Sequence, residues 1–267
     1  MAKDPKSPAI ITLTTDFGGG SRYVAAMKGV ILSINPQAQL IDLSHAVPHQ
    51  DIRTGAIVLA ETTRWYPPET IHMAVVDPGV GSSRRIVYAR IGSQQFIAPD
   101  NGLLSRLSFL ERPSKIVCLS ESKYWLKDVS HTFHGRDVMA PVAARLSLGL
   151  SPDVLGKPLE QLIELTWPEV HREPNRIDGE VVEVDSFGNL ITNITRDMLH
   201  GVPTNEVVVV KCEAHETHGI YSTYSDQPSM TFMAHVGSTG RLELAVVDEN
   251  ASAMLGVRVG ALVYVTW

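Results

Sequence analysis

The chain has 267 residues, 44% hydrophobic and 19% charged, which is enough for one large domain or two modest ones with a sizeable core. Its formal net charge of -6 excludes the basic footprint that binding to DNA or RNA requires. The cysteines, Cys118 and Cys212, lie far apart in apolar runs and indicate reduced thiols. The chain starts with polar residues, and no apolar stretch approaches the roughly 20 residues of a membrane helix. We therefore expect a soluble, cytoplasmic protein.

From residue 10 to about residue 156, strand-like runs alternate with helical patterns. A strand over 10–15 ends at Asp16, and Ser21 is expected to cap a helix that closes before Pro36. The elements predicted next are a strand at 40–43, a helix at 51–66, a strand ending at Asp77, a hairpin of 86–91 and 95–98, a short helix from 103, a strand at 115–119 and a helix at 138–150 with Asp137 as its N-cap. This alternation predicts a mostly parallel sheet flanked by helices.

The character of the sequence changes after residues 167–178, a segment with two prolines and several charges that we interpret as a linker. Beyond it, the strand-like runs show almost no helical periodicity; they cover 179–184, 190–194, 206–213, 241–247 and 261–266. The sequence therefore predicts an α/β domain at 1–166 that carries the catalytic residues, followed by a small all-β, barrel-like domain at 179–267.

Three predicted strand ends in the first domain carry polar residues beside glycines. They are Thr14-Thr15-Asp16-Phe17-Gly18-Gly19-Gly20, Asp77-Pro78-Gly79-Val80-Gly81 and Pro99-Asp100-Asn101-Gly102. Because the carboxyl ends of parallel strands share one edge of a sheet, we expect these segments to converge there. Each segment read alone also fits a simpler interpretation. Asp77 can end a strand in a tight turn with Arg84 and Arg85 in solvent, and Asp16 can belong to a helix-capping turn.

Two pairs of histidines have the short spacing of potential zinc or iron ligands, His45 with His49 and His215 with His218. Pro48 prevents a regular helical face between the first two. We therefore favour surface or supporting roles for both pairs. His134 is different, because its segment, 133–137, is one of those that carry a family resemblance.

The three strand ends, together with Phe133-His134-Gly135-Arg136-Asp137 and Phe187-Gly188-Asn189, resemble the S-adenosyl-L-methionine (SAM) hydroxide adenosyltransferases. These are the SAM hydrolases related to fluorinase and chlorinase. The resemblance covers nearly the whole chain, in order. It implies an N-terminal α/β domain, a C-terminal barrel-like domain, a homotrimer with sites between neighbouring subunits, and no cofactor or metal. The implied reaction is attack of water or hydroxide on C5′ of SAM, giving adenosine and L-methionine.

Carried over position by position, the resemblance places the hydrolase triad on Asp77, Arg84 and His134, with Arg85 as the alternative if the register is one residue off. Asp16 matches the residue that holds the ribose hydroxyls. The positions that match contacts to adenine and methionine lie in the C-terminal domain: Asp185, Phe187, Asn189, Ser238, Glu243 and Val246.

The halogenases carry Tyr where Asp77 stands, and fluorinase carries a halide-binding Ser where Gly135 stands. A carboxylate repels an anion, so the resemblance favours hydrolysis over halogenation. We expect Asp77 and His134 to bind the attacking water jointly while Arg84 fixes the carboxylate. The sulfonium epimer of SAM stays open, the R epimer included. Two other functions also stay open: a non-catalytic protein that binds SAM or adenosine, and a metal-dependent nucleoside or nucleotide hydrolase built on His45, His49, Asp16 and Asp77.

Overall fold

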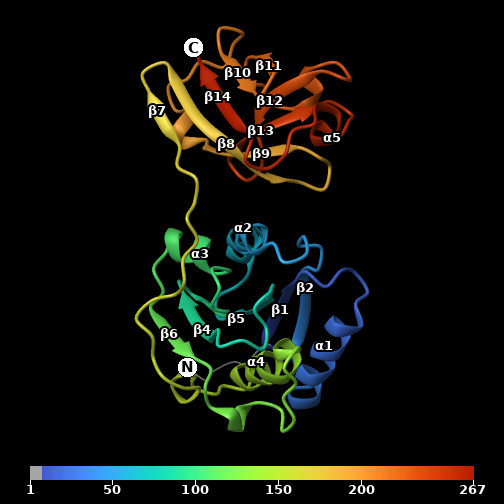
Figure 1. Ribbon diagram of the computed structural model, residues 1–267, viewed down its shortest axis with the longest axis vertical. Coiled ribbons are helices and arrows are strands. Elements are labelled where there is room, and N and C mark those ends of the chain that lie inside the picture. Colours follow the sequence, from blue (N-terminus) through green and yellow to red (C-terminus); the bar gives the residue numbers. More distant parts are fainter. Residues whose placement is uncertain (1–7) are drawn as a thin grey trace, which may run out of the picture. The chain divides into compact units, whose positions relative to one another are not determined.

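The computed structural model describes residues 8–267, and the chain divides into two compact units, Met1–Leu165 and Thr166–Trp267 (Figure 1). Unit 1 contains a six-stranded sheet with the order β2-β1-β3-β5-β4-β6. Its strands are β1 (Ile10–Thr15), β2 (Gln39–Ser44), β3 (Ile71–Val75), β4 (Ile86–Ile91), β5 (Gln94–Pro99) and β6 (Lys115–Cys118). The neighbours β2, β1, β3 and β5 run parallel, whereas β4 is antiparallel to both β5 and β6. The sheet is therefore mixed, with one reversed strand.

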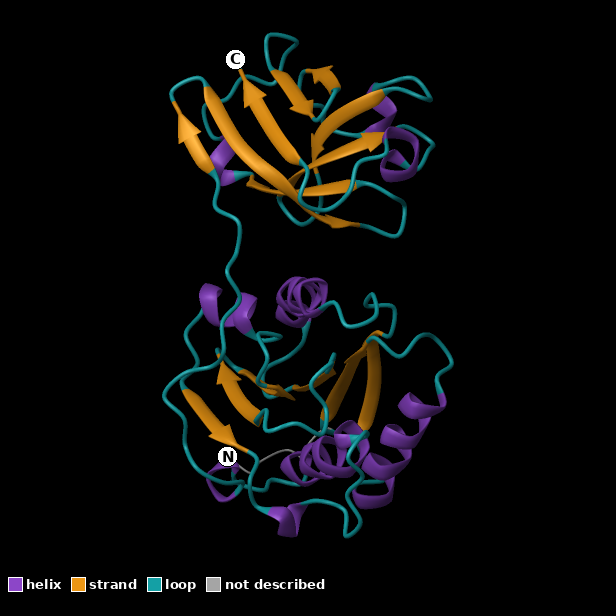
Figure 2. Cartoon of the chain, viewed as in Figure 1, coloured by secondary structure: helices purple, strands orange, loops and turns teal. Residues whose placement is uncertain are grey.

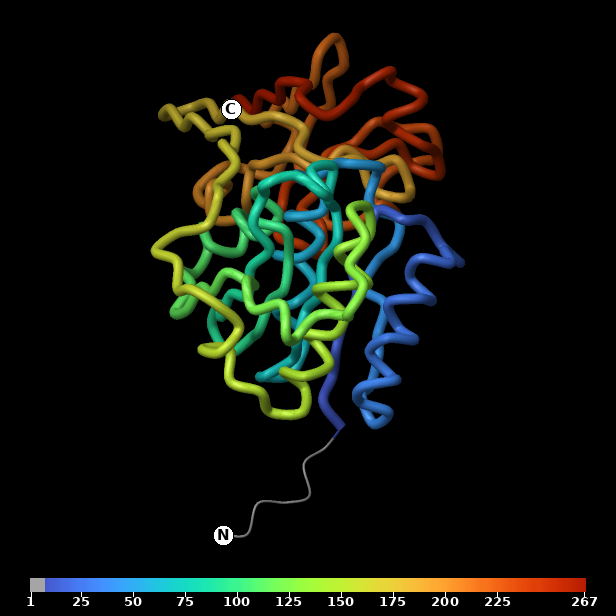
Figure 3. The backbone as a smooth tube through the Cα atoms, turned by 60° about the horizontal axis from the view of Figure 1, so that its bottom comes forward, coloured from blue at the N-terminus to red at the C-terminus, as the bar shows by residue number. Residues whose placement is uncertain are grey.

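Helices cover both faces of this sheet (Figure 1). On one face α1 (Arg22–Ile34) and α4 (Ala140–Ser147) lie side by side (Figures 1 and 3). On the other face lie α2 (Ile52–Thr62) and α3 (Ser105–Leu110). The two faces bury separate apolar clusters, one around Met27 and Val142 and the other around Leu59 and Leu107. The predicted cap of the first helix is confirmed, because the Ser21 hydroxyl accepts a hydrogen bond from the Tyr23 amide.

Two helix ends differ from the sequence prediction. The second helix stops at Thr62, and a 3₁₀ turn, Thr63–Trp65, leads to the pair of prolines that the sequence marks as the stop. The last helix begins earlier than predicted, because residues Gly135–Met139 form a π-helical turn that runs directly into α4. Asp137 lies inside this turn, so the prediction that it is an N-cap is wrong. Its carboxylate instead points back to Ser130.

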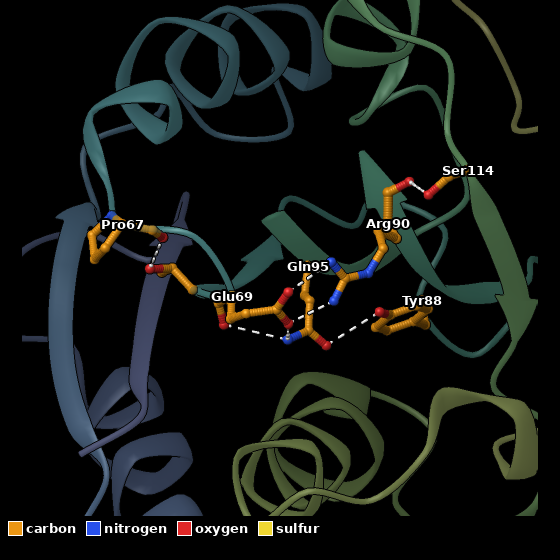
Figure 4. A network of polar contacts seen from close by, with 7 residues as sticks. Pro67, Glu69, Tyr88, Arg90, Gln95 and Ser114 are labelled. Atoms are coloured by element: carbon orange, nitrogen blue, oxygen red, sulfur yellow. Dashed lines mark hydrogen bonds and ion pairs between the residues drawn. The ribbon is translucent and has the colours of Figure 1, made fainter. Parts of the chain in front are cut away.

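The edge of the sheet where the parallel strands begin is closed by paired polar side chains (Figure 4). Arg90 on β4 donates two hydrogen bonds to the Glu69 carboxylate, at 2.8 and 2.6 Å. Gln95 on β5 donates to the same carboxylate at 3.1 Å and accepts a hydrogen bond from the Tyr88 hydroxyl at 3.1 Å. The Arg90 guanidinium also lowers the pKa of Glu69. The polar side chains at this edge of the sheet therefore form hydrogen bonds with one another.

Unit 2 consists mainly of strands (orange in Figure 2). They are β7 (His171–Glu173), β8 (Arg176–Val184), β9 (Leu190–Thr195), β10 (Val209–Cys212), β11 (His215–His218), β12 (Phe232–Val236), β13 (Arg241–Val246) and β14 (Leu262–Thr266), with one short helix, α5 (Ala251–Leu255). All paired neighbours in the order β11-β10-β14-β8-β9-β13-β12 are antiparallel. The end strands β11 and β12 contact each other, so the sheet is nearly closed like a barrel.

The segment interpreted as a linker is partly strand. From His171 onward it forms β7 and the start of β8, a hairpin in which His171 pairs with Asp178. The β7 residues are all exposed, so they show no alternation of apolar and polar side chains that a sequence pattern can detect. The strands β11 and β12 were also absent from the prediction. Within residues 8–267, no helix is long and apolar enough to cross a membrane.

Candidate active site

A cavity of about 230 Å³ lies at the carboxyl edge of the unit 1 sheet. Its lining includes residues that follow β1 and β3 and residues of the loops before α2 and α4: Asp16, Phe17, Asp77, Gln50, Phe133 and His134. The structure thus brings together the first two of the three polar strand ends, and it adds the histidine loop from much later in the chain. This is the edge at which open α/β sheets bind ligands.

Asp77, which lines this cavity, forms a buried pair with Arg84. The Arg84 Nε donates to Asp77 Oδ1 at 2.6 Å, and Nη2 donates to Oδ2, so the contact is bidentate. The two side chains are 5% and 9% exposed. The Pro-Gly turn between them is closed by hydrogen bonds from Ser82, whose amide and hydroxyl both donate to the Gly79 carbonyl. The orientation of the carboxylate is therefore fixed by both its partner and its turn.

The reversed strand β4 explains how an arginine reaches this edge. Because β4 runs against its neighbours, its first residues lie beside the last residues of β5, and Ile86 pairs with Pro99. Arg84 and Arg85 precede Ile86 and so lie where the parallel strands end. The Arg85 Nη2 lies 2.5 Å from Asp100 Oδ2. Of the two arginines considered from the sequence, Arg84 is the one that contacts Asp77.

His134 completes the group with its Nδ1 atom 3.1 Å from Arg84 Nη2. A guanidinium can only donate, so Nδ1 accepts, and the proton of the neutral ring is on Nε2. Burial lowers the pKa of His134 below 6.5, and the Arg84 charge lowers it further, although Asp77 and Asp137 act in the opposite direction. The ring is therefore neutral at pH 7. It presents a donor rather than a second acceptor.

The loop that carries His134 is held by a fully buried carboxylate, Asp137. Its Oδ2 accepts from the Ser130 amide at 2.9 Å and from the Ser130 hydroxyl at 2.7 Å, and its Oδ1 accepts from Arg136 Nε at 2.5 Å. The Arg136 charge and the Ser130 hydrogen bonds lower the pKa of Asp137 against the opposing effect of burial. The loop is thus closed on both sides of the histidine. The sequence analysis missed Ser130.

Gly81 joins this loop to the Asp77 turn. It has φ of +81°, and a Cβ atom at this position would lie 2.4 Å from the His131 carbonyl oxygen. Only glycine permits both that backbone conformation and that close approach. The turn and the histidine loop therefore pack directly against each other, which fixes the distance between Asp77 and His134.

Asp16 is 5% exposed and is held at one carboxylate oxygen. Its Oδ2 accepts from the Gln50 amide at 2.8 Å, and His49 Nδ1 lies 3.4 Å from the same atom. Gln50 adopts a positive φ of 62°, an uncommon conformation for a residue with a side chain. No sequence pattern singles out Gln50, which directly precedes the α2 cap, Asp51.

The third polar strand end supports the site from outside the cavity lining. Asn101 donates to the Val76 carbonyl at 2.9 Å, immediately before Asp77. Asp100 Oδ1 accepts from the Ile163 amide at 2.8 Å, and its other oxygen faces Arg85. The prediction that three strand ends meet at one edge holds, but only two of them line the cavity.

The histidine pairs do not form a metal centre in the described part of the chain. No group of three or more His, Cys, Asp or Glu residues within residues 8–267 lies close enough together to hold a metal ion. His45 contacts Thr15 and Asp42 instead, and His215 lies 3.1 Å from the Leu255 carbonyl.

Unit 2 carries a separate polar cluster. Asp185 Oδ1 accepts from the amides of Phe187 and Asn189, at 2.9 and 2.8 Å, so the loop is turned around this carboxylate. Phe187 is 77% exposed. A cavity of about 510 Å³ is lined by three of the predicted contact residues and by several others, in full Phe187, Asn189, Tyr224, Val246, Asp248, Glu249 and Asn250.

Tyr224 is the residue of this cluster that the sequence analysis missed. The Asn189 amide nitrogen donates to Asp185 Oδ2 at 3.0 Å and to the Tyr224 hydroxyl at 3.2 Å. Both amide hydrogens are thus used, and the Asn189 Oδ1 remains as an acceptor. Burial raises the pKa of Tyr224, and Glu243 and Asp185 raise it further, so the hydroxyl keeps its proton. The only sequence signal was the Thr223–Asp226 capping box that forms the turn around it.

Two predicted contact residues lie outside this cavity lining. Glu243 on β13 is buried beside His235, whose Nε2 lies 3.5 Å from its carboxylate. Ser238 is exposed in the turn between β12 and β13. A Cβ atom on Gly237 would collide with the Glu243 carboxylate, so this turn and that side chain are packed together.

Comparison with known proteins decides the family. The sequence model of the SAM hydroxide adenosyltransferase N-terminal domain matches residues 11–156, and that of the C-terminal domain matches residues 179–264. The chain belongs to the SAM hydroxide adenosyltransferase family. Its two family domains fall within unit 1 and unit 2, respectively.

Individual relatives support this assignment over nearly the full length. A protein of Salinispora tropica named (R)-S-adenosyl-L-methionine hydrolase is 38% identical, covering 96% of this chain and 97% of its own. A protein of the same name from Thermus thermophilus is 37% identical, covering 92% of this chain and 95% of its own. The crystal structure of an uncharacterized conserved protein from Thermotoga maritima has a TM-score of 0.91 at 35% identity, covering 96% of this chain and 100% of that one.

Proposed function

We propose that this family member hydrolyses SAM to adenosine and L-methionine by attack of water at C5′. The observation that carries the proposal is the connected group of Asp77, Arg84 and His134, in which Asp77 and His134 line the same cavity as Asp16. The relatives at 37–38% identity are named for the R epimer of SAM, and we propose the same epimer as the substrate of this chain.

The chemistry needs an oriented water and no acid. The leaving group is a neutral thioether released from a sulfonium, so nothing has to protonate it. Holding the water in line with the C5′–S bond can lower the barrier by about 7 kcal/mol or more. As the C5′–O bond forms and the C5′–S bond breaks, the electron pair of the broken bond stays on sulfur. The water then releases one proton.

The site residues divide these tasks. Both Asp77 oxygens accept from Arg84, yet each carboxylate oxygen retains a further lone pair, so Asp77 can accept a hydrogen from the water. His134, with its proton on Nε2, donates to the water oxygen. We therefore propose Asp77 as the group that takes the proton, His134 as the donor that orients the water, and Arg84 as the clamp that fixes both. A halide is disfavoured beside the Asp77 carboxylate.

The remaining predicted contacts recognise the rest of the substrate in this proposal. The Asp16 carboxylate accepts hydrogen bonds from the ribose hydroxyls, and the Gln50 backbone amide orients it by donating to Oδ2. Asn189 Oδ1 accepts from the amino group of adenine while the Tyr224 hydroxyl donates to a ring nitrogen, a pairing that matches one edge of that base. Phe187 and Val246 supply apolar contact. We assign Asp185, Ser238 and Glu243 to the methionine end.

We also propose that the active protein is the homotrimer that the family resemblance implies. Light scattering of the purified chain tests this, since a trimer of 29.2 kDa subunits is readily distinguished from a monomer or dimer.

The decisive experiment compares the wild type with Asp77→Asn on stereochemically defined R and S epimers of SAM, following adenosine by HPLC with and without EDTA. We expect release of adenosine from the R epimer, undiminished by EDTA, and a loss of about 10²-fold or more in kcat for Asp77→Asn. Asp153→Asn is the matched control, because Asp153 forms an exposed pair with Lys115 away from the cavity. Wild-type turnover by Asp77→Asn would exclude the assigned role. Activity lost with EDTA would favour a metal-dependent hydrolase, and binding without turnover a SAM or adenosine sensor.

A further inference from the structure

A line of polar side chains outside the cavity runs from the surface of unit 1 to the turn that carries Asp16. Lys28 on α1 lies 2.7 Å from Asp42 Oδ2, and Asp42 Oδ1 lies 2.9 Å from His45 Nε2. The other ring nitrogen, His45 Nδ1, lies 2.9 Å from the Thr15 hydroxyl. We refer to Lys28, Asp42, His45 and Thr15 as the support line.

A donor lies at each end of the support line, the Phe17 amide at Thr15 and Lys28 at Asp42. The Thr15 hydroxyl accepts from the Phe17 amide at 3.2 Å, so its own hydrogen is available for His45 Nδ1. The other ring nitrogen of His45, Nε2, faces the Asp42 carboxylate. Lys28 supplies the opposite charge on the far side of Asp42.

The support line reaches Thr15, the residue before Asp16, and none of its four members lines the cavity. Thr15 is fully buried, so a ligand cannot reach its hydroxyl. The Gly18 amide donates to the His45 carbonyl at 2.9 Å, which fixes the chain on the other side of Asp16. The Thr15 hydroxyl before Asp16 and the Gly18 amide after it are therefore both bound to the same histidine.

We propose that His45 is a positioning residue that sets the preference of Asp16 for a ribose with free 2′ and 3′ hydroxyls. A carboxylate that serves two neighbouring hydroxyls must be held within about 0.5 Å of its working position. The hydrogen bond from the Gln50 amide fixes one carboxylate oxygen, and the support line fixes the main chain that carries it. This inference rests on the ribose contact of Asp16 in the proposed function.

The test measures the Kd of the product adenosine and of 2′,3′-dideoxyadenosine by calorimetry on the full-length protein. The ratio of the two constants isolates recognition of the hydroxyls, because a general loss of structure weakens both nucleosides alike. We expect a wild-type ratio on the order of 10 to 100, and a ratio near 1 for Asp16→Asn. His45→Gln, which places its amide toward Asp42 and loses the contact to Thr15, is expected to lower the ratio by about 3- to 10-fold. His45→Asn, whose amide oxygen replaces Nδ1, is expected to retain most of it.

A second pair of variants keeps the test decisive if a His45 variant does not fold. Asp42 is 42% exposed, so Asp42→Ala leaves the core intact and should lower the ratio as well. Asp153→Ala removes a similar exposed Lys–Asp pair unconnected to the site and should leave the ratio unchanged. Equal weakening of both nucleosides by His45→Gln and Asp42→Ala overturns the positioning role while the ribose contact stands. A wild-type ratio in Asp16→Asn overturns the ribose contact itself and this inference with it.

Discussion

Two neighbouring arginines offer the sharpest test of the site. Arg84 and Arg85 are adjacent in the sequence and have the same chemistry, but the first contacts Asp77, which lines the cavity, and the second contacts Asp100, which does not. Arg84→Gln and Arg85→Gln remove the same charge from neighbouring positions. If the geometry is functional, the two variants must differ strongly in catalysis.

The size of the difference follows from the contacts. Arg84 makes two charge-assisted hydrogen bonds to Asp77, each contributing about 1.5–3 kcal/mol. Even the loss of one such contribution in the transition state costs about 10-fold, and the loss of both costs on the order of 10² to 10⁴, because about 1.4 kcal/mol corresponds to a factor of ten. We expect at least about 100-fold lower kcat for Arg84→Gln. Arg85 touches neither the water site nor His134, so Arg85→Gln should stay within about 2-fold of wild type.

The assay is the initial rate of adenosine release from the R epimer, combined with an NMR titration of the His134 ring. The Arg84 charge lowers the pKa of His134, so Arg84→Gln should move the His134 titration to higher pH, whereas Arg85→Gln should leave it in place. Equal rates for the two variants, or an unmoved titration in Arg84→Gln, would refute the assignment of Arg84 as the clamp on both side chains.

Three further outcomes are expected from features near the site and in the core. Burial lowers the pKa of His72 to about 4, so the stability that the neutral ring contributes is complete above pH 6.5 and falls by about 3 kcal/mol as the pH approaches 4. Urea unfolding of the wild type and of His72→Gln between pH 7 and 4.5 should therefore show a weaker pH dependence of the unfolding free energy in the variant. Parallel curves for the two proteins would contradict this expectation. Gly81→Ala should lower both Tm and kcat, because its Cβ would collide with the His131 carbonyl; an unchanged kcat would mean that the turn and the loop move independently. Asp137→Asn should lower the apparent acidic pKa of the kcat–pH profile, since the Asp137 charge raises the pKa of His134. In this variant the side-chain oxygen of Asn can still accept from the Ser130 amide, which should preserve the loop. Reduced activity with an unshifted pH profile would assign Asp137 a purely structural role.

The sequence predicted the site best where the chemistry follows directly from a strand end. Asp16 and Asp77 follow strands that are apolar and buried, and the rule that parallel strands share a carboxyl edge placed them together. The hairpin of β4 and β5 was also predicted from the Gly92-Ser93 turn. The structure adds that this hairpin reverses β4 and so places Arg84 beside Asp77.

Other parts of the site could not be predicted from sequence patterns, and the reasons are physical. The contact between Gly81 and His131 joins segments fifty residues apart, and nothing local in either one signals the other. Asp137 looked like a helix cap because Asp is favoured there, but a π-helical turn extended the helix past it. Tyr224 and Gln50 line cavities from turns whose conformation is set by their own hydrogen bonds rather than by periodicity.

Because β4 is reversed, both residues of the Asp77–Arg84 pair lie in one short segment of the chain. Both partners come from consecutive strands joined by one tight turn, whereas Asp16 and His134 arrive from distant parts of the chain. Insertions in other loops of unit 1 can reshape the substrate cavity and leave the pair intact. A single residue added between positions 77 and 84 would shift the register and separate anion from cation.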